Sequence, residues 1–446
     1  MNDAKSPAKL LRAIPVRLRF AVAVVVVGLG AAGFAIAFRS ALHHLFRQPA
    51  NAGDVVEAMR GLPIWLRLLL PALGGLLAGL IGRVVARSPQ GHGVGDVMEA
   101  IVLGHVRLSF RVTVLKSLAS FCAIVTGGSL GREGPLIQFG GASGKLLSDW
   151  CGLSHHDTRR LIAAGTAAGF ASAYNTPFAA VLFVVEVVIG VVVLDMVIPA
   201  LVATVIAAEL TRYAVGGGPI YGQRAFALGS PWELLAFALL GLLTACAAQA
   251  FMRLLHWGEQ VAQKVSLPWR PAVGGLLAGA FVAVLPEVAG NGYEPLNELL
   301  DARFSVSFVL VLLIAKSIAT TASVSSGSPG GVFTPALLIG GGLGFCYGAL
   351  LAAALPGSTA PPAGYALVGM AAATAATAHA PLMAAVMVFE LSTDYGIVLP
   401  LAISTAVATA ASRGMRKDSI YGAELRARGV GWSLTLEGRA VERHKP

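Results

Sequence analysis

Long stretches of apolar residues, separated by short polar segments, dominate this sequence. Residues 317–389 contain no Asp, Glu, Lys or Arg, whereas one membrane-spanning helix needs only about 20 apolar residues. Shorter uncharged runs lie at residues 20–38, 68–82, 161–185, 234–252, 271–286 and 395–412. Several of them are too short or too rich in glycine for simple lipid-facing helices, which is typical of tilted, re-entrant or broken helices. The pattern therefore predicts an all-α polytopic membrane protein.

Composition and charge agree with a membrane location. Hydrophobic residues make up 56% of the 446 residues and charged residues 13%, against roughly 25% charged residues in soluble domains. The net charge is +10, but the basic residues cluster at the two ends of the chain. They are Lys5, Lys9, Arg12, Arg17 and Arg19 before the first apolar run, and Arg413, Arg416, Lys417, Arg426 and Arg428 after the last. The positive-inside rule then predicts two cytoplasmic termini and an even number of crossings, so no nucleic-acid partner is expected.

The first apolar run and the cysteines change this picture little. The run at residues 20–38 is long and lacks a small-residue cleavage site, so we interpret it as a retained span rather than a signal peptide. Cys122, Cys151, Cys246 and Cys346 lie far apart, mostly among apolar residues. We therefore expect no disulfide framework, no metal site and no cofactor.

The chain repeats itself at an offset of about 200 residues. PALGGLLAG at residues 71–79 returns as PAVGGLLAG at residues 271–279, with eight of nine positions identical. Ionisable and proline positions keep the same order, which the packing of glycine-rich helices does not by itself explain. The pairs are Glu99 with Glu298, Lys116 with Lys316, Pro135 with Pro335, Pro177 with Pro381 and Glu186 with Glu390.

This repetition predicts the organisation of the chain. We expect two membrane repeats at residues 20–215 and 231–412, a cytoplasmic segment at 1–19, and a cytoplasmic helix and tail at 413–446. Two such repeats in a transporter commonly form an inverted pair, with the substrate site at their interface near the middle of the membrane.

Two adjacent ionisable residues, Arg132 and Glu133, are the only charges in residues 117–144. Charges inside membrane segments are costly and mark functional sites by default. They lie in the glycine-rich sequence GSLGREGP at residues 128–135, which leads into an apolar run. The amides at such a helix start carry partial positive charge and can hold an anion. An anionic Glu133 could occupy the same place, which makes it a candidate gate; alternatively, the two residues only cap a helix or pair with each other.

The second half carries a matching helix start. Residues 327–335 read GSPGGVFTP, again a glycine turn that leads into an apolar helix. Two helix starts from opposite repeats can converge on one anion. A phosphate-binding loop is the other common use of glycine-rich turns, but no Lys-Ser or Lys-Thr pair follows either one. Nucleotide binding is therefore not expected.

Three histidine or glutamate positions leave alternatives open. His92, in GHG at residues 91–93, could line a pore and sense pH, or it could cap a loop. Glu186 could belong to an ion pathway or only pair locally, and its repeat mate Glu390 favours a structural role. His379, with Ser325, Ser326 and Ser328, could form an intramembrane serine hydrolase site. The absence of a matching acidic residue to orient the histidine argues against this reading.

Taken together, these motifs resemble the CLC family of chloride channels and chloride/proton antiporters, over residues 20–430. GREGP at residues 131–135 resembles the family's gating-glutamate motif, and GVFTP at 331–335 resembles its second anion-binding helix start. Tyr421, in DSIYG at residues 418–422, stands where the family places its pore tyrosine. The resemblance implies a homodimer with one pathway per subunit and inverted repeats of tilted, partly broken helices.

The resemblance also implies roles for individual residues. Glu133 would be the gate and Tyr421 would contribute its hydroxyl to the anion. Backbone amides would come from the two helix starts, at Arg132, Glu133, Gly134, Val332, Phe333 and Thr334. The nearest family branch would be that of bacterial voltage-gated-type chloride channels, in the inner membrane.

Two departures from the family pattern shape the expected function. Where the family reads GSGIP, residues 91–95 read GHGVG, so His92 replaces the pore serine. Fluoride-exporting members carry methionine there, whereas Pro135 and Tyr421 favour chloride. Proton-coupled members have a second glutamate directly after the position of Glu186, but Val187 stands there.

We therefore expect a protein that is not an enzyme and that lets chloride cross the bilayer in a channel-like or weakly coupled way. Glu186 would be the one candidate for an indirect proton pathway. Two alternatives stay open: chloride/proton antiport by a different proton route, and export of another anion such as fluoride.

Overall fold

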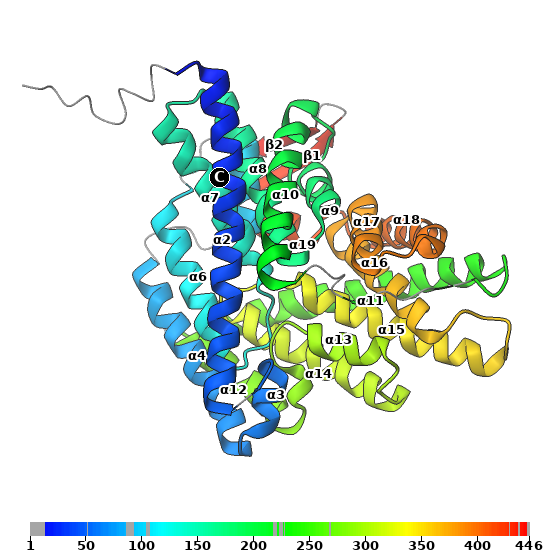
Figure 1. The fold of residues 1–446 in the computed structure, drawn as a ribbon. Coiled ribbons are helices and arrows are strands. Elements are labelled where there is room, and N and C mark those ends of the chain that lie inside the picture. Colours follow the sequence, from blue (N-terminus) through cyan, green and yellow to red (C-terminus); the bar gives the residue numbers. More distant parts are fainter. Residues whose placement is uncertain are drawn as a thin grey trace, which may run out of the picture.

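Helices account for nearly all of the ordered structure in this computed structural model (Figure 1). The structure describes residues 14–50, 52–85, 93–103, 108–216, 221–222, 226, 228–266, 269–427, 429–435 and 438–443. His92, the predicted pore-lining histidine, lies outside the described residues.

The first half of the chain folds into helices that run from α2 to α10. Their bounds are α2 (Val16–Ala50), α3 (Val55–Gly61), α4 (Ile64–Val85), α5 (Val94–Leu103), α6 (Phe110–Val125), α7 (Glu133–Cys151), α8 (His155–Tyr174), α9 (Pro177–Leu182), the π-helix η1 (Phe183–Ile189) and α10 (Leu194–Val215). In Figure 1 the long helix α2 runs from the top to the bottom of the molecule, and α10 lies beside its upper part.

The second half repeats this order and adds a small C-terminal hairpin. Its elements are α11 (Glu233–Ala262), α12 (Trp269–Val284), η2 (Pro286–Val288), α13 (Tyr293–Leu300), α14 (Val306–Ser325), α15 (Phe333–Ala354), α16 (Pro362–Ala378), α17 (Pro381–Ser392), η3 (Tyr395–Ile397), α18 (Val398–Met415), α19 (Ile420–Ala427), β1 (Val430–Thr435) and β2 (Gly438–Arg443). In Figure 1, α11, α15 and α18 run across the direction of α2, so helices of the two halves are strongly tilted relative to each other.

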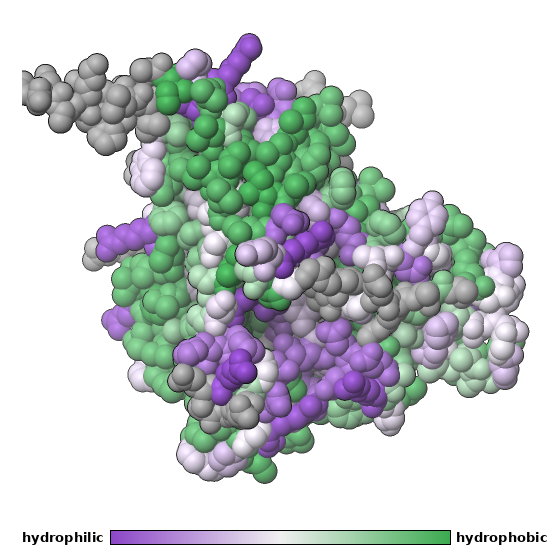
Figure 2. All heavy atoms as spheres, in the orientation of Figure 1, coloured by the Kyte–Doolittle hydropathy of each residue, from purple (hydrophilic) through white to green (hydrophobic). Residues whose placement is uncertain are grey.

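The predicted all-α membrane fold is confirmed. Seven helices of the described residues are long and apolar enough to cross a membrane, and α12 and α17 are among the shorter apolar helices. Large apolar side chains face outward, for example Leu194 and Ile198 of α10, which are 70% and 63% exposed. Figure 2 shows a hydrophobic surface over α10 and the upper part of α2. Apolar side chains exposed over such an area suit contact with lipid or with another apolar protein surface.

The repeated sequence at residues 71–79 and 271–279 forms the contact between α4 and α12. A side chain at Gly75 would overlap the carbonyl of Pro271, and a side chain at Gly275 would overlap the carbonyl of Pro71. Glycine at both positions therefore lets the two backbones touch, as small residues do between membrane helices. The contacts are reciprocal, as an approximate two-fold axis between the two halves requires.

A surface ion pair also joins the two halves. Arg60 of α3 lies 2.6 Å from Glu287 and 3.3 Å from Glu298. Hydrogen bonding to Glu287 raises the pKa of the Arg60 guanidinium. This contact ties the short helix α3 to the loop and helix that follow α12.

Candidate functional site

The site begins at a short antiparallel bridge between the two repeats. The amide of Gly131 donates to the carbonyl of Gly331 at 2.7 Å, and the amide of Gly331 donates to the carbonyl of Gly131 at 2.8 Å. Each glycine directly precedes the first turn of a helix, α7 in one repeat and α15 in the other. The bridge therefore brings two helix N-termini, with their partial positive charges, to the same point.

Glu133 extends from the start of α7 to the start of α15. Its Oε1 accepts hydrogen bonds from the amide of Phe333 at 2.9 Å and, more weakly, from the amide of Thr334 at 3.4 Å. Its Oε2 accepts from the hydroxyl of Thr334 at 3.1 Å. The side chain is buried, with 2% of its surface exposed. The carboxylate thus occupies an anion site built from backbone amides and one hydroxyl, the kind of site that a helix start offers.

The two bridge glycines leave the room that this carboxylate fills. A β-carbon at Gly131 or at Gly331 would overlap the carboxylate of Glu133. Glycine at both positions is therefore a steric requirement of the observed arrangement, which explains why the same residue precedes both helix starts.

Tyr174 supports the site from the end of α8. Its hydroxyl lies 3.0 Å from the hydroxyl of Thr334, and its side chain is 1% exposed. Thr334 therefore links a buried tyrosine to the carboxylate of Glu133. Tyr174 was not among the residues predicted from the sequence; a lone tyrosine within an alanine-rich and glycine-rich segment was the signal that could have found it.

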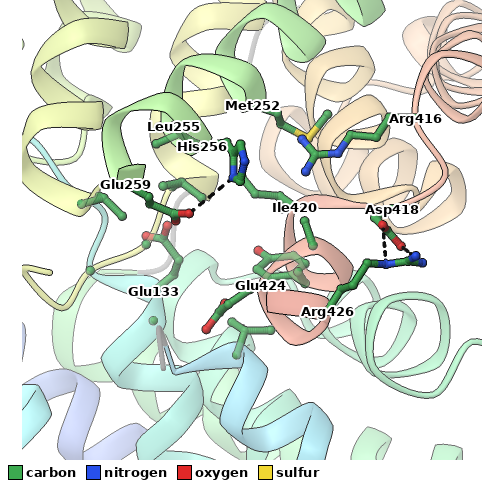
Figure 3. Close-up of a pocket in the computed structure, with 18 residues that line it drawn as sticks. Glu133, Met252, Leu255, His256, Glu259, Arg416, Asp418, Ile420, Glu424 and Arg426 are labelled. Atoms are coloured by element: carbon green, nitrogen blue, oxygen red, sulfur yellow. Dashed lines mark hydrogen bonds and ion pairs between the residues drawn. The ribbon is translucent and has the colours of Figure 1, made fainter. Parts of the chain in front are cut away.

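A cavity of about 310 Å³ opens beside Glu133 and is bordered by α19. We name it the α19 cavity. Gly134, Val332 and Tyr421 line it together with Glu133. Figure 3 shows Glu133 on one wall near Glu259 and His256 of α11, with charged residues of α19 and its preceding loop on another. The structure thus brings Glu133 and Tyr421 to one space, although they are far apart in sequence.

A second cavity, of about 550 Å³, lies beside the C-terminal end of α2 and the helix α3. We name it the α2–α3 cavity. The side chain of Arg132 borders this cavity and lies over the ring of Tyr293, at 5.1 Å from its centroid. Arg132 and Glu133 are neighbours in the chain, yet they line different cavities. The turn at residues 131–133 therefore separates the two spaces.

A small void joins the first turn of α7 to the segment that follows residue 92. Gly93, Gly134 and Gly330 border it, as do Lys116 and Gln138. Lys116 and Gln138 both donate to the carboxylate of Asp96, at 2.7 and 2.8 Å. In the sequence Lys116 stands out only as a repeat marker, and this polar group could not be predicted because its members lie on three different helices.

Glu186 occupies a different part of the molecule. Its carboxylate accepts hydrogen bonds from the amides of Leu382 and Met383 at the start of α17, at 3.3 and 2.6 Å. Its repeat mate Glu390 does the same at the start of α9, with bonds of 3.0 and 2.8 Å to the amides of Phe178 and Ala179.

Each glutamate therefore caps a helix of the opposite repeat: Glu186 caps α17, and Glu390 caps α9. Val187, which follows Glu186 in the π-helix η1, is fully buried. Among the described residues, the lining of the α19 cavity includes neither Glu186 nor Val187.

The serine hydrolase alternative finds no support in the geometry. His379 Nε2 lies 3.2 Å from Ser412 Oγ, and Ser412 in turn donates to the carbonyl of Ala376. Ser325 donates to the carbonyl of Leu255, and Ser326 to that of Ser323. Ser325 and Ser326 are therefore bonded to the main chain, and the histidine contacts Ser412 instead of either of them.

Comparison with known proteins agrees with this architecture. The sequence model described as voltage gated chloride channel matches residues 74–413. A protein of Ralstonia nicotianae described as a ClcB-like chloride channel protein is 39% identical over 402 residues, which cover 89% of this chain and 94% of that protein. The voltage-gated ClC-type chloride channel ClcB of Citrobacter koseri is 33% identical over 377 residues, covering 83% of this chain and 90% of that one.

A solved structure shows the same fold at low sequence identity. The crystal structure of a slow cyanobacterial Cl⁻/H⁺ antiporter superposes with a TM-score of 0.82 at 24% identity, covering 92% of this chain and 98% of that chain. Together with the amide-bonded Glu133 and the paired helix starts, these matches lead to one conclusion. The chain is a multi-pass membrane protein that belongs to the CLC family of voltage gated chloride channels.

Proposed function

We propose that this protein lets chloride cross the membrane through a pathway that Glu133 opens and closes. The observation that carries this proposal is the carboxylate of Glu133, which accepts hydrogen bonds from the amide of Phe333 and from the amide and hydroxyl of Thr334. Chloride is a monovalent anion and seeks the same donors. A bound carboxylate and a passing chloride ion therefore compete for one site.

Protonation of Glu133 would release the site. A neutral carboxyl group loses its attraction to the helix start of α15, because that attraction depends on negative charge. The side chain can then leave and a chloride ion can take its place. We propose that the amides of Arg132, Gly134 and Val332 complete the anion pathway, and that the hydroxyl of Tyr421 faces it from the α19 cavity.

We further propose that the α19 cavity opens to the cytoplasm and the α2–α3 cavity to the opposite side. The basic residues at both ends of the chain support this orientation, because such residues favour the cytoplasmic side. The relatives named above are bacterial, which supports a place in a bacterial inner membrane.

A homodimer is part of the proposal. Leu194 and Ile198 of α10, together with Leu399 of α18, expose apolar surface that a second copy could cover.

Proton coupling is expected to be weak or absent. The position after Glu186 holds a valine, whose side chain cannot carry a proton, and the carboxylate of Glu186 is engaged by two amides of α17. Adjacent residues of the π-helix η1 point in different directions, so Glu186 cannot simply take over the direction of Val187. We infer that chloride gradients drive little uphill proton movement.

One observation favours the second candidate function, chloride/proton antiport. The α19 cavity brings Glu259, His256 and Glu424 to the same space as Glu133. These titratable groups offer protons a route to the gate that does not pass Val187.

Liposomes containing the purified protein distinguish these functions when chloride efflux and proton movement are recorded together. The channel-like proposal expects chloride efflux with no uphill proton transport. Pumping of protons against their gradient at a fixed chloride-to-proton ratio would establish the antiporter instead. Fluoride efflux that greatly exceeds chloride efflux in the same liposomes would favour the fluoride alternative.

A further inference from the structure

The α2–α3 cavity contains cationic groups that the gate does not use. Arg39 of α2 and Arg132 both border it, and the charge of Arg132 acts on Arg39. His43, His44 and Arg47 line the same cavity toward the end of α2, where they are exposed. Figure 2 shows hydrophilic side chains gathered around this end of α2 and α3.

Arg39 and Arg132 are half-buried, and among the described residues their guanidinium groups have no direct counter-ion. Within the described part of the chain, no carboxylate oxygen lies within 4 Å of the guanidinium of Arg39 or Arg132. The Nε of Arg132 is buried and makes no hydrogen bond with these residues. Tyr293, whose ring lies under Arg132, is 6% exposed, and its hydroxyl likewise has no partner among them. These groups therefore have hydrogen-bond donors that are open to water or to an anion that enters the cavity.

The carboxylates of this cavity do not fill that role. Asp54 accepts a hydrogen bond from the amide of Glu57 and caps α3. Glu294 borders the cavity, and its Oε2 is buried and makes no hydrogen bond within the described residues. Glu294 is close enough for its charge to interact with Arg132 but does not contact it. It therefore balances the arginines only at a distance.

We propose that Arg39 and Arg132 form an anion-binding site that loads the transported anion before it reaches Glu133. Two like charges repel each other, and an anion placed between them relieves that repulsion. Guanidinium groups are well suited to this role, since they remain charged and present several donors in a fixed plane. Arg132 directly precedes Glu133, so an anion held here lies across the turn at residues 131–133 from the gate. The inference rests on the proposed chloride pathway and adds a site to it.

Glu294 weakens anion binding at this site, because its negative charge already interacts with the positive charge that would attract the anion. Its carboxylate carries the same sign as the ligand and borders the same cavity. Removing its charge should therefore tighten anion binding, whereas removing the charge of Arg39 should weaken it. If anion binding depended only on the total positive charge around the cavity, neutralising any of its cationic residues would weaken binding equally.

The test is a titration of flux against chloride concentration, with the protein in liposomes at pH 8, where an ordinary histidine is largely neutral. Arg39→Gln should raise the half-saturating chloride concentration about three- to tenfold, because a charged hydrogen-bonding group is lost, while the rate at saturating chloride persists. Arg39→Lys should fall between Arg39→Gln and the wild type. Glu294→Gln should lower the half-saturating concentration. Arg47→Gln, the control at the exposed mouth of the same cavity, should leave it unchanged.

Several outcomes would overturn the site. One is an unchanged half-saturating concentration in Arg39→Gln and Glu294→Gln; another is an equal shift in Arg39→Gln and Arg47→Gln. If Arg39→Gln is inactive at every chloride concentration, Glu294→Gln decides the question alone, since it predicts the opposite change. Glu133→Gln, assayed in parallel, separates this inference from the proposed function. If Glu133→Gln changes gating but Arg39→Gln leaves the half-saturating concentration unchanged, only the loading site is rejected. If Arg39→Gln changes that concentration but Glu133→Gln leaves gating unchanged, only the gate is rejected.

Discussion

The two helix starts at the centre of the molecule have matching backbones but differ in one side chain. The turns at residues 131–135 and 331–335 each begin with a bridge glycine and place a proline in the first helical turn. At the first residue of the helix, α7 carries Glu133 where α15 carries Phe333. Glu133 reaches across to the amides of the other repeat, whereas the Phe333 ring packs edge-on against Phe170.

This difference separates two tasks. The shared backbone provides amide donors from both repeats, which is what an anion needs. The single carboxylate provides a competitor that can be switched off by a proton. A carboxylate at both starts would place two like charges at one site, and their repulsion would prevent both from being ionised. The repeat therefore accounts for binding, and the departure from the repeat accounts for control.

The largest effect on chloride flux is expected from removing the carboxylate that distinguishes the two helix starts. Glu133→Gln replaces the anionic competitor with a neutral amide that helix starts attract less strongly. The wild-type carboxylate is held by charge-assisted hydrogen bonds, each of which corresponds to about tenfold or more in occupancy, so chloride flux at pH 7 should rise about tenfold or more and lose its pH dependence. Chloride efflux from liposomes between pH 4.5 and pH 7.5 measures both quantities. Flux and pH response identical to the wild type would show that Glu133 is not the gate.

A smaller effect is expected from weakening the receiving helix start. Thr334→Val keeps the shape of the side chain but removes the hydroxyl that donates to Glu133 and contacts Tyr174. The loss of one such bond corresponds to about two- to tenfold in occupancy, so the carboxylate should leave more readily and flux at pH 7 should rise by that factor.

A matched control is Thr320→Val, whose hydroxyl pairs with Ser129 away from the carboxylate. Equal flux changes in the two variants would mean that the Thr334 bond has no special part in gating.

His92→Ser tests the histidine that stands in the first repeat where the family has a pore serine. A histidine is partly cationic near pH 6.5, and one charge close to an anion in a water-filled path contributes about 1 kcal/mol. The variant should therefore change the ratio of chloride flux at pH 6 to that at pH 8 by about two- to fivefold, or alter the preference among anions. Identical values of both in mutant and wild type would place His92 outside the pathway.

The smallest effect on transport is expected at Glu186 and Glu390, where the two repeats carry the same residue in the same role. Glu186→Gln and Glu390→Gln should each weaken one reciprocal helix cap and cost about 1 kcal/mol of stability. The two variants should therefore show similar, small decreases in thermal midpoint in detergent and similar chloride flux. Proton movement that is lost in Glu186→Gln but kept in Glu390→Gln would instead assign Glu186 to a proton pathway.

Much of the architecture could be predicted from local pattern. Uncharged runs such as residues 317–389 predicted membrane helices, because charge is costly in lipid. The near-identity of residues 71–79 and 271–279 predicted an inverted pair, and the structure places these segments against each other. Arg132 and Glu133 stood out as isolated charges. All these signals depend only on residue type and order, which the sequence gives directly.

Contacts between distant segments could not be predicted in this way. Three such contacts join different helices: the bonds that Glu133 accepts from Phe333 and Thr334, the polar group around Asp96, and the cavity that Arg39 and Arg132 share. The reciprocal caps of Glu186 and Glu390 are a further case. Sequence determined the helices, their repetition and the candidate gate, since these follow from hydropathy, spacing and charge. Only the tertiary structure decided which donors each carboxylate meets, because side-chain partners depend on how tilted helices cross.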